Sequence, residues 1–273
     1  MKKAKSSPNV SSEPAPPAVE WHTPPPPSQL SLPEGVVHVW RADLGLQAAH
    51  LRRLEQNLSA KEQARASRFR FARDRGRFIA ARSLLREILA LYLNTSAQRL
   101  SFGYSAYGKP FLAGAEHSTL RFNVSHSLDT MLLAIAHMRE VGVDVERVSN
   151  NGVAVEEIAE TVLSEPEKQA LARLGDEDKR INFLRFWTRK EAYIKADGRG
   201  VSLPLERIDV SASEGRAAVL DESTGEWRTC TRWELRTLAA GPEYVAALAA
   251  EGQDWSLARW RWSARPSTSP TRE

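Results

Sequence analysis

Residues 130–147, Thr-Met-Leu-Leu-Ala-Ile-Ala-His-Met-Arg-Glu-Val-Gly-Val-Asp-Val-Glu-Arg, carry the pattern that decides the fold. The apolar run 131–136 and the alternating run 141–146 read as the two strands of a hairpin. Side chains alternate along a strand, so Asp144 and Glu146 share one face and the three valines share the other. A hairpin of this kind among helical segments favours an α+β fold over a repeated βαβ unit.

Helical and strand patterns continue on both sides of this hairpin. The segment 74–92 has an apolar stripe at helical spacing, with Arg75, Arg82 and Arg86 on another face. Further helices are expected at 153–163, 165–173 and 177–196, and strands at 36–40 and in pieces within 226–250.

The basic residues are concentrated in one segment. The whole chain of 273 residues has a net charge of +4, whereas residues 61–86 hold nine Lys and Arg against two acidic residues. Such a segment predicts an anionic partner, unless it forms a solvated face. An RNA-binding module built on this segment is one alternative, and the expected lack of interleaved exposed aromatic side chains weakens it.

We expect neither a membrane nor a nucleic acid as a partner, because a net charge of +4 is too small to imply nucleic-acid binding by itself. The single cysteine, Cys230, excludes a disulfide framework and indicates a reducing, cytoplasmic setting. The longest apolar run, 244–250, is too short to span a bilayer. Residues 1–35, with nine of the fifteen prolines, and residues 263–273 are expected to be unstructured tails around a folded body at 36–262.

Two acidic motifs suggest a metal site. Asp144 and Glu146 lie about 7 Å apart along the strand, and together they can bind a hard cation such as Mg²⁺. The alternative is an edge strand with a solvated acidic face. In the expected helix 177–196, Glu191 and Lys195 share a face, where they can complete a metal site and neutralise a phosphate. The alternative is an ordinary helix-stabilising ion pair.

Three further motifs suggest phosphate binding. Ser125 and His126 follow one another before the first hairpin strand and offer hydroxyl and imidazole donors. Lys109 is presented by a Gly-Lys-Pro turn. Each of these has a purely structural alternative, as does the arginine-rich helix 74–92, whose arginines can form a solvated face.

In this order, the motifs resemble the 4′-phosphopantetheinyl transferases of the larger, single-chain type that activates peptide and polyketide synthases. The resemblance runs from about Ser59 to Leu205. The segments that carry it are 59–86 (SAKEQARASRFRFARDRGRFIAARSLLR), 107–112 (YGKPFL), 122–127 (FNVSHS), 142–146 (GVDVE) and 186–205 (FWTRKEAYIKADGRGVSLPL).

The resemblance implies a pseudo-twofold monomer of two similar α/β halves, 36–138 and 139–262, with the active site in the cleft between them. It implies a Mg²⁺-dependent transfer of the 4′-phosphopantetheine group from coenzyme A to a serine of an acidic apo acyl or peptidyl carrier protein. Adenosine 3′,5′-bisphosphate would be released. A Mg²⁺-dependent phosphohydrolase, which needs no acceptor protein, remains an alternative from the residues alone.

The resemblance also implies a role for each candidate residue. The metal would be held by Asp144, Glu146 and Glu191, and Glu191 would also accept the proton of the acceptor serine. The transferred phosphate would contact Lys195, with assistance from Lys190. The nucleotide end of coenzyme A would be held by Ser125, His126, Lys109, Arg82 and Arg77.

Overall fold

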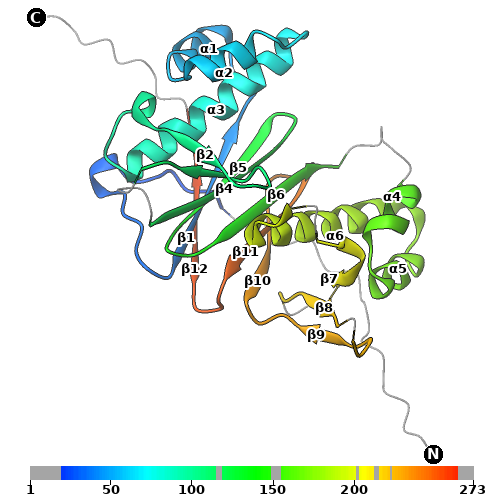
Figure 1. Ribbon diagram of the computed structural model, residues 1–273. Coiled ribbons are helices and arrows are strands. Elements are labelled where there is room, and N and C mark those ends of the chain that lie inside the picture. Colours follow the sequence, from blue (N-terminus) through cyan, green and yellow to red (C-terminus); the bar gives the residue numbers. More distant parts are fainter. Residues whose placement is uncertain are drawn as a thin grey trace, which may run out of the picture.

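The computed structural model describes residues 20–114, 119–148, 155–200, 203–211, 215–221 and 223–263 (Figure 1). The N-terminal half contains the helices α1 (Ala48–Glu55), α2 (Ala60–Ala66) and α3 (Ala72–Tyr92) and the strands β1 (Val36–Asp43), β2 (Phe102–Tyr104), β3 (Pro110–Leu112), β4 (Leu120–Ser127) and β5 (Thr130–His137).

The C-terminal half repeats this order of elements. It contains the helices α4 (Val155–Val162), α5 (Glu165–Ala172) and α6 (Asp176–Asp197) and the strands β6 (Val141–Arg147), β7 (Ile208–Asp209), β8 (Ala218–Leu220), β9 (Trp227–Thr229), β10 (Trp233–Leu238), β11 (Tyr244–Glu251) and β12 (Ser256–Arg261). The mixed helix and strand content confirms the α+β prediction. No helix in the described ranges is long and apolar enough to cross a lipid bilayer.

Each half builds its sheet in the same way. In the first sheet the strand order is β12-β1-β5-β4, and in the second it is β10-β11-β6. Each half therefore consists of a strand, then helices, then two antiparallel strands, of which the last pairs with the first. This equivalence is what the expectation of two similar halves requires.

Three apolar cores stabilise the fold, and the second of them joins the two halves. The first core lies between α1–α3 and one face of the first sheet. The second lies between the two sheets and brings Val37 and Val39 against Val143 and Val145. The third lies between the second sheet and α6. The valine face of β6 is therefore buried between the sheets, and Asp144 and Glu146 point toward the α6 side.

The helix ends agree with local sequence signals. Ser59 and Ser164 each begin a helix with a reciprocal capping box, in which Glu62 and Glu167 return the hydrogen bond. Helix α6 ends at Gly198, which has a φ of 84°. The expected helices 74–92 and 177–196 are thus confirmed to within two residues at each end.

The prediction of an unstructured tail over residues 1–35 is wrong for residues 20–35. Trp21 packs on the second core, and its Nε1 donates to the Ala239 carbonyl at 2.7 Å. Leu30 and Leu32 pack on the first core. The backbone of His22 pairs with the last strand, since its N–H donates to the Arg259 carbonyl at 3.1 Å. A few apolar side chains therefore fix a proline-rich segment. Residues 1–19 lie outside the described residues.

The C-terminal boundary is also more complex than predicted. Strand β12 lies within the expected half 139–262, but it pairs in parallel with β1, as Figure 1 shows. The chain therefore returns to the N-terminal sheet after completing the second sheet. Of the predicted tail 263–273, only Ser263 is described, and residues 264–273 lie outside the described residues.

Candidate functional site

The two sheets meet where β4 lies beside β6, and polar side chains join these two edge strands. Asn123 Oδ1 accepts the Val143 N–H at 2.9 Å. Ser125 Oγ donates to Asp144 Oδ1 at 2.8 Å. Further along, Ser127 Oγ donates to a carboxylate oxygen of Glu146 at 2.9 Å. These side chains alternate along β4, so the period of the strand orients both carboxylates of β6.

Helix α6 approaches β6 unusually closely because β6 carries a glycine at residue 142. A β-carbon at this position would collide with the Ala192 carbonyl and the Ala196 amide of the helix. Glu191 and Lys195 flank this contact, so the missing side chain of Gly142 sets their distance from the carboxylates of β6.

Asp144 lies at the centre of the site and is only 3% exposed. Lys195 Nζ donates to its Oδ1 at 2.6 Å and also lies 3.3 Å from Ser125 Oγ. Glu191 lies 3.9 Å from the same ammonium. The structure thus brings Ser125, Asp144, Glu191 and Lys195 together, as the sequence predicts, and Glu146 lies beside them through Ser127.

The carboxylates are held in a setting that disfavours their charge. Burial raises the pKa of Glu146, and the neighbouring Asp144 raises it further. Burial also raises the pKa of Glu191, which the Lys195 ammonium lowers and the two carboxylates of β6 raise again. Three acidic groups therefore compete for one cationic side chain, and perturbed carboxylates of this kind are typical of functional sites.

The donor set fits a hard cation. Asp144 Oδ2 is buried and has no hydrogen-bond partner among the described residues. Such an unsatisfied carboxylate oxygen is costly unless a ligand completes it. Carboxylate oxygens are the donors that Mg²⁺ prefers. Within the described ranges, no three His, Cys, Asp or Glu side chains are already gathered closely enough to hold a metal. The fit therefore rests on donor chemistry and on the unpaired oxygen.

Lys109 and His126 lie at the edges of this site. Lys109 Nζ donates to Glu140 Oε2 at 2.7 Å and lies 3.3 Å from the Ala196 carbonyl, so it joins the start of β6 to the end of α6. His126 is exposed on β4. Desolvation by nearby atoms lowers its pKa, and the Lys195 ammonium lowers it further. A neutral imidazole here retains one donor and one acceptor.

Arg82 and Arg77 are already engaged on α3. The Arg82 guanidinium contacts Glu62 Oε1 at 2.6 Å, and its side chain is 16% exposed. Arg77 forms a two-pronged pair with Asp129, at 2.8 and 3.0 Å. Binding of a phosphate by either arginine therefore requires sharing with, or loss of, a carboxylate partner.

Lys190 corrects the sequence prediction. Its side chain is fully buried, and its Nζ lies 2.7 Å from Glu167 Oε2. The same ammonium donates to the carbonyls of Val162, Leu205 and Ile208. Four acceptors enclose it, so Lys190 joins α6 to α5 and β7 and cannot assist at a substrate phosphate. The assignment of Lys190 to the coenzyme A site is therefore wrong.

Two other features differ from the sequence analysis. Ser127, which holds Glu146, was not among the candidates, although it shares a strand face with Ser125.

In the basic segment, Phe69 and Phe71 are exposed beside Arg70, whose guanidinium lies 5.4 Å from the Phe71 ring. The expected lack of exposed aromatic side chains in this segment is therefore wrong.

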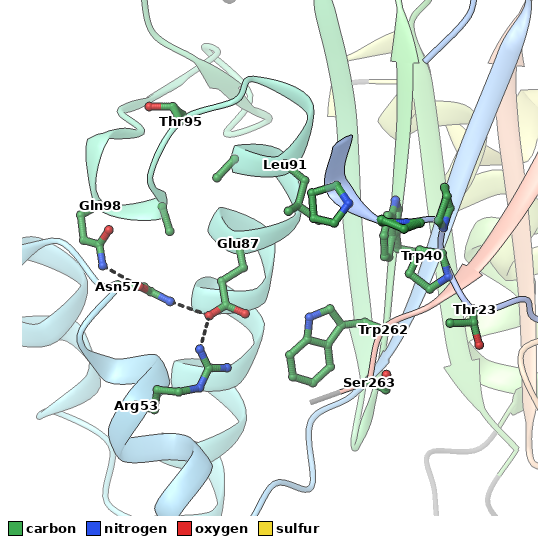
Figure 2. Close-up of a pocket in the computed structure, with 16 residues that line it drawn as sticks. Thr23, Trp40, Arg53, Asn57, Glu87, Leu91, Thr95, Gln98, Trp262 and Ser263 are labelled. Atoms are coloured by element: carbon green, nitrogen blue, oxygen red, sulfur yellow. Dashed lines mark hydrogen bonds and ion pairs between the residues drawn. The ribbon is translucent and has the colours of Figure 1, made fainter. Parts of the chain in front are cut away.

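A separate cavity of about 860 Å³ lies between residues 23–27, α3 and the end of β12. Figure 2 shows its polar wall, where Arg53 and Asn57 both donate to Glu87 and Gln98 donates to Asn57. None of the predicted site residues lines this cavity. The candidate chemistry therefore belongs to the carboxylates at β6 and α6.

Two family models match this chain. Residues 46–138 match a model described as 4′-phosphopantetheinyl transferase, N-terminal, and residues 140–258 match the 4′-phosphopantetheinyl transferase superfamily. Together these two ranges include all of the predicted site residues.

Curated relatives show the same similarity along most of their length. The 4′-phosphopantetheinyl transferase HetI of Nostoc sp. strain PCC 7120 is 36% identical over 239 residues, which are 87% of this chain and 97% of the relative. The 4′-phosphopantetheinyl transferase of Bacillus subtilis is 27% identical over 78% of this chain and 91% of its own length. The chain therefore belongs to the 4′-phosphopantetheinyl transferases, in their larger, single-chain form.

Proposed function

We propose that this enzyme transfers the 4′-phosphopantetheine group of coenzyme A to a serine of an apo acyl or peptidyl carrier protein, with Mg²⁺. The observation that carries the proposal is that Asp144 and Glu191 share Lys195, while Asp144 Oδ2 is buried without a partner among the described residues. Glu146 lies beside them, held by Ser127. The names of the similar proteins support the same reaction class.

The three carboxylates would hold Mg²⁺, which, when bound, supplies neutralisation of charge at the pyrophosphate. Each carboxylate is held in place by its own neighbours, which orient it for metal binding. Asp144 is fixed by Ser125 and Lys195, and Glu146 is fixed by Ser127. Glu191 comes from α6, so the site spans two elements that the contact at Gly142 holds together.

In the proposed reaction the serine oxygen of the carrier protein attacks the β-phosphorus, which bears the pantetheine arm. The bond from this phosphorus to the bridging oxygen breaks, and adenosine 3′,5′-bisphosphate leaves. Glu191, which extends from α6 beside Lys195, would accept the serine proton. Lys195 uses two of its three N–H donors on Asp144 and Ser125, so one remains for a phosphate oxygen.

The nucleotide end of coenzyme A would be bound by Ser125, His126 and Lys109, with Arg82 and Arg77 as candidates on α3. Dephospho-coenzyme A should be a much poorer donor than coenzyme A. If Lys109 binds the 3′-phosphate, Lys109→Ala should narrow this difference, because each charged contact is worth about 1.5–3 kcal/mol. An unchanged donor preference in Lys109→Ala would exclude that contact.

The proposal includes a monomeric enzyme in the cytoplasm. The single cysteine, Cys230, is unpaired in the structure and supports a reducing setting. The acceptor would be acidic, which suits the surplus of basic residues at 61–86.

An intact-mass measurement tests the proposal. Apo carrier protein is incubated with the enzyme, coenzyme A and Mg²⁺, and its mass should rise by one phosphopantetheine group. Release of phosphate without a change in carrier mass would instead indicate a phosphohydrolase. RNA binding that weakens steeply with salt, without modification of the carrier, would favour the exposed Arg70 and Phe71 surface as an RNA-binding site.

A further inference from the structure

A polar cavity of about 310 Å³ opens at one end of the layer between the two sheets. Three arginines from three strands line it: Arg41 of β1, Arg147 of β6 and Arg261 of β12. Arg41 and Arg261 are register partners in the parallel β1–β12 pair, so neighbouring strands place their side chains together. The predicted catalytic residues do not line this cavity.

The arginines share the cavity with three carboxylates, Asp43, Asp129 and Glu243, but they keep unused N–H donors. Neither Arg41 nor Arg261 has a hydrogen-bonded or ion-paired side-chain partner among the residues that the structure describes. Burial lowers the pKa of Arg41, the like charge of Arg261 lowers it further, and the nearby Asp43 carboxylate raises it in part. Arg147 reaches Glu243 only through Nη2, at 3.2 Å, and its buried Nε has no hydrogen-bond partner in the described part of the chain.

The carboxylates beside these arginines also bind other groups. Asp129, at the rim, forms its two-pronged pair with Arg77 of α3. Asp43 accepts the Gly45 N–H at 2.8 Å. Several guanidinium N–H donors are therefore available in the cavity, and the planar guanidinium group is suited to a carboxylate or phosphate.

An apolar side chain stands beside this cavity at the tip of the β4–β5 turn. Leu128 is 40% exposed and has a φ of 48°. A leucine rarely adopts this left-handed backbone, which favours glycine and asparagine, so the position carries strain. The next residue, Asp129, lines the cavity. An exposed leucine in a strained turn contributes nothing to the apolar cores and suits contact with another molecule.

Ser127 links this surface to the catalytic site through hydrogen bonds to β6. Ser127, directly before Leu128, donates to the Glu146 carboxylate at 2.9 Å and accepts the Arg147 N–H at 3.2 Å. Glu146 and Arg147 are neighbours on β6 and point to opposite faces. One arginine of the cavity, Arg147, is therefore the sequence neighbour of a carboxylate of the proposed metal site.

We infer that Leu128 and the cavity arginines Arg41, Arg147 and Arg261 form a docking face for the carrier protein, with a carboxylate side chain of the carrier bound between the arginines. This inference rests on the proposed function, in which the acceptor is a serine of another protein. A surface next to Glu146 must then contact that protein. A free inorganic anion would satisfy the arginines but would make no use of Leu128.

Steady-state kinetics with the full-length enzyme test the inference, with the apo carrier protein as the varied substrate. Arg261→Glu reverses an exposed charge, and Leu128→Asn removes the apolar contact while asparagine accepts the left-handed backbone. Arg99→Glu is the matched control. Arg99 is also exposed, but it lies after the C-terminal end of α3 and does not line the arginine cavity. Each of the two docking variants should raise the KM for carrier protein about tenfold or more. The KM for coenzyme A should stay unchanged in all three variants.

A binding measurement separates docking from catalysis. Wild-type enzyme and variants are titrated with a carrier protein whose acceptor serine is replaced by alanine, and the Kd should rise in Arg261→Glu and Leu128→Asn but not in Arg99→Glu. If wild-type enzyme modifies the carrier protein but both docking variants keep native KM and Kd, the inference is wrong while the proposed function stands. Binding of inorganic phosphate at the arginines with an unchanged Kd for carrier would also overturn it. If the wild-type enzyme modifies no carrier protein, the proposed function falls, and the inference falls with it.

Discussion

Lys195 Nζ lies 2.6 Å from Oδ1 of Asp144, whereas Oδ2 of the same carboxylate is buried without a partner in the described part of the chain. The two oxygens of one side chain therefore have different roles. One is fixed by a lysine and a serine, which orients the carboxylate. The other is presented to the site, where only a ligand can satisfy it.

The close approach of α6 to β6 should be essential for activity. Gly142→Ala places a methyl group against the helix backbone, so α6 must move and carry Glu191 and Lys195 away from Asp144. We expect a loss of about 1–3 kcal/mol in the free energy of unfolding and at least a tenfold loss of kcat. Gly175→Ala is the control, because a β-carbon there meets nothing within 4 Å. Native kcat in Gly142→Ala would show that this contact does not position the site.

Lys190 should affect stability rather than substrate binding. Lys190→Met leaves the buried Glu167 without its ion-pair partner, which should cost about 3–5 kcal/mol in urea unfolding. Adding Glu167→Gln should recover part of this loss, because it removes the buried charge while an amide oxygen can still accept a backbone N–H of the capping box. If Lys190→Met keeps native stability but has a raised KM for coenzyme A, Lys190 contacts the substrate and its structural assignment is wrong.

His38 should make the fold sensitive to acid. Burial lowers its pKa from 6.5 to about 4. Trp40 Nε1 donates to the Tyr92 oxygen, so the Tyr92 hydroxyl can donate to His38 Nδ1 of the neutral imidazole, 2.7 Å away. The unfolded chain then binds more protons than the folded chain between these two pH values. Stability is fully present above pH 6.5 and is lost as the pH falls, by about 3 kcal/mol at most.

Urea unfolding between pH 7.5 and pH 4 measures this contribution. His38→Gln should flatten the pH dependence in that window, whereas a change at the exposed His22 should leave it intact. The same slope in wild type and His38→Gln would mean that His38 is not the titrating group.

The proline-rich segment at 20–35 should contribute to stability. Trp21→Ala removes an indole that packs on the second core and a hydrogen bond to Ala239, and we expect a loss of about 1–3 kcal/mol. Thermal unfolding of Trp21→Ala and of the exposed control Gln29→Ala compares the two. Equal melting temperatures of the two variants would show that Trp21 and its segment contribute little to stability.

The elements that carry the site could be predicted because each depends on a short-range period. Alternation along β6 places Asp144 and Glu146 on one face, and the i,i+4 spacing on α6 places Glu191 beside Lys195. Ser127 was within reach of the same argument, since it alternates with Ser125 on β4. These predictions need no knowledge of what the elements pack against.

The parts that were missed depend on long-range packing. From the sequence alone, Lys190 has the pattern of a polar residue on a helix surface. It is buried because Glu167 of α5 and a carbonyl of β7 pack against it, and these contacts are distant in sequence. Trp21 stands alone in a proline-rich stretch, so local composition conceals its contact with Ala239, 218 residues later. The pairing of β12 with β1 likewise follows from tertiary packing alone.

The rate of phosphopantetheine transfer by Asp144→Asn tests the central claim most directly. The change keeps the size of the side chain and one carbonyl oxygen but removes the charge that holds Lys195 and would hold Mg²⁺. With apo carrier protein, coenzyme A and Mg²⁺, the rate of carrier mass change should fall at least 100-fold relative to wild type. Circular dichroism should remain native, and a chelator should reduce the wild-type rate in the same way. Full transfer by Asp144→Asn, or full wild-type transfer in chelator, would contradict the account.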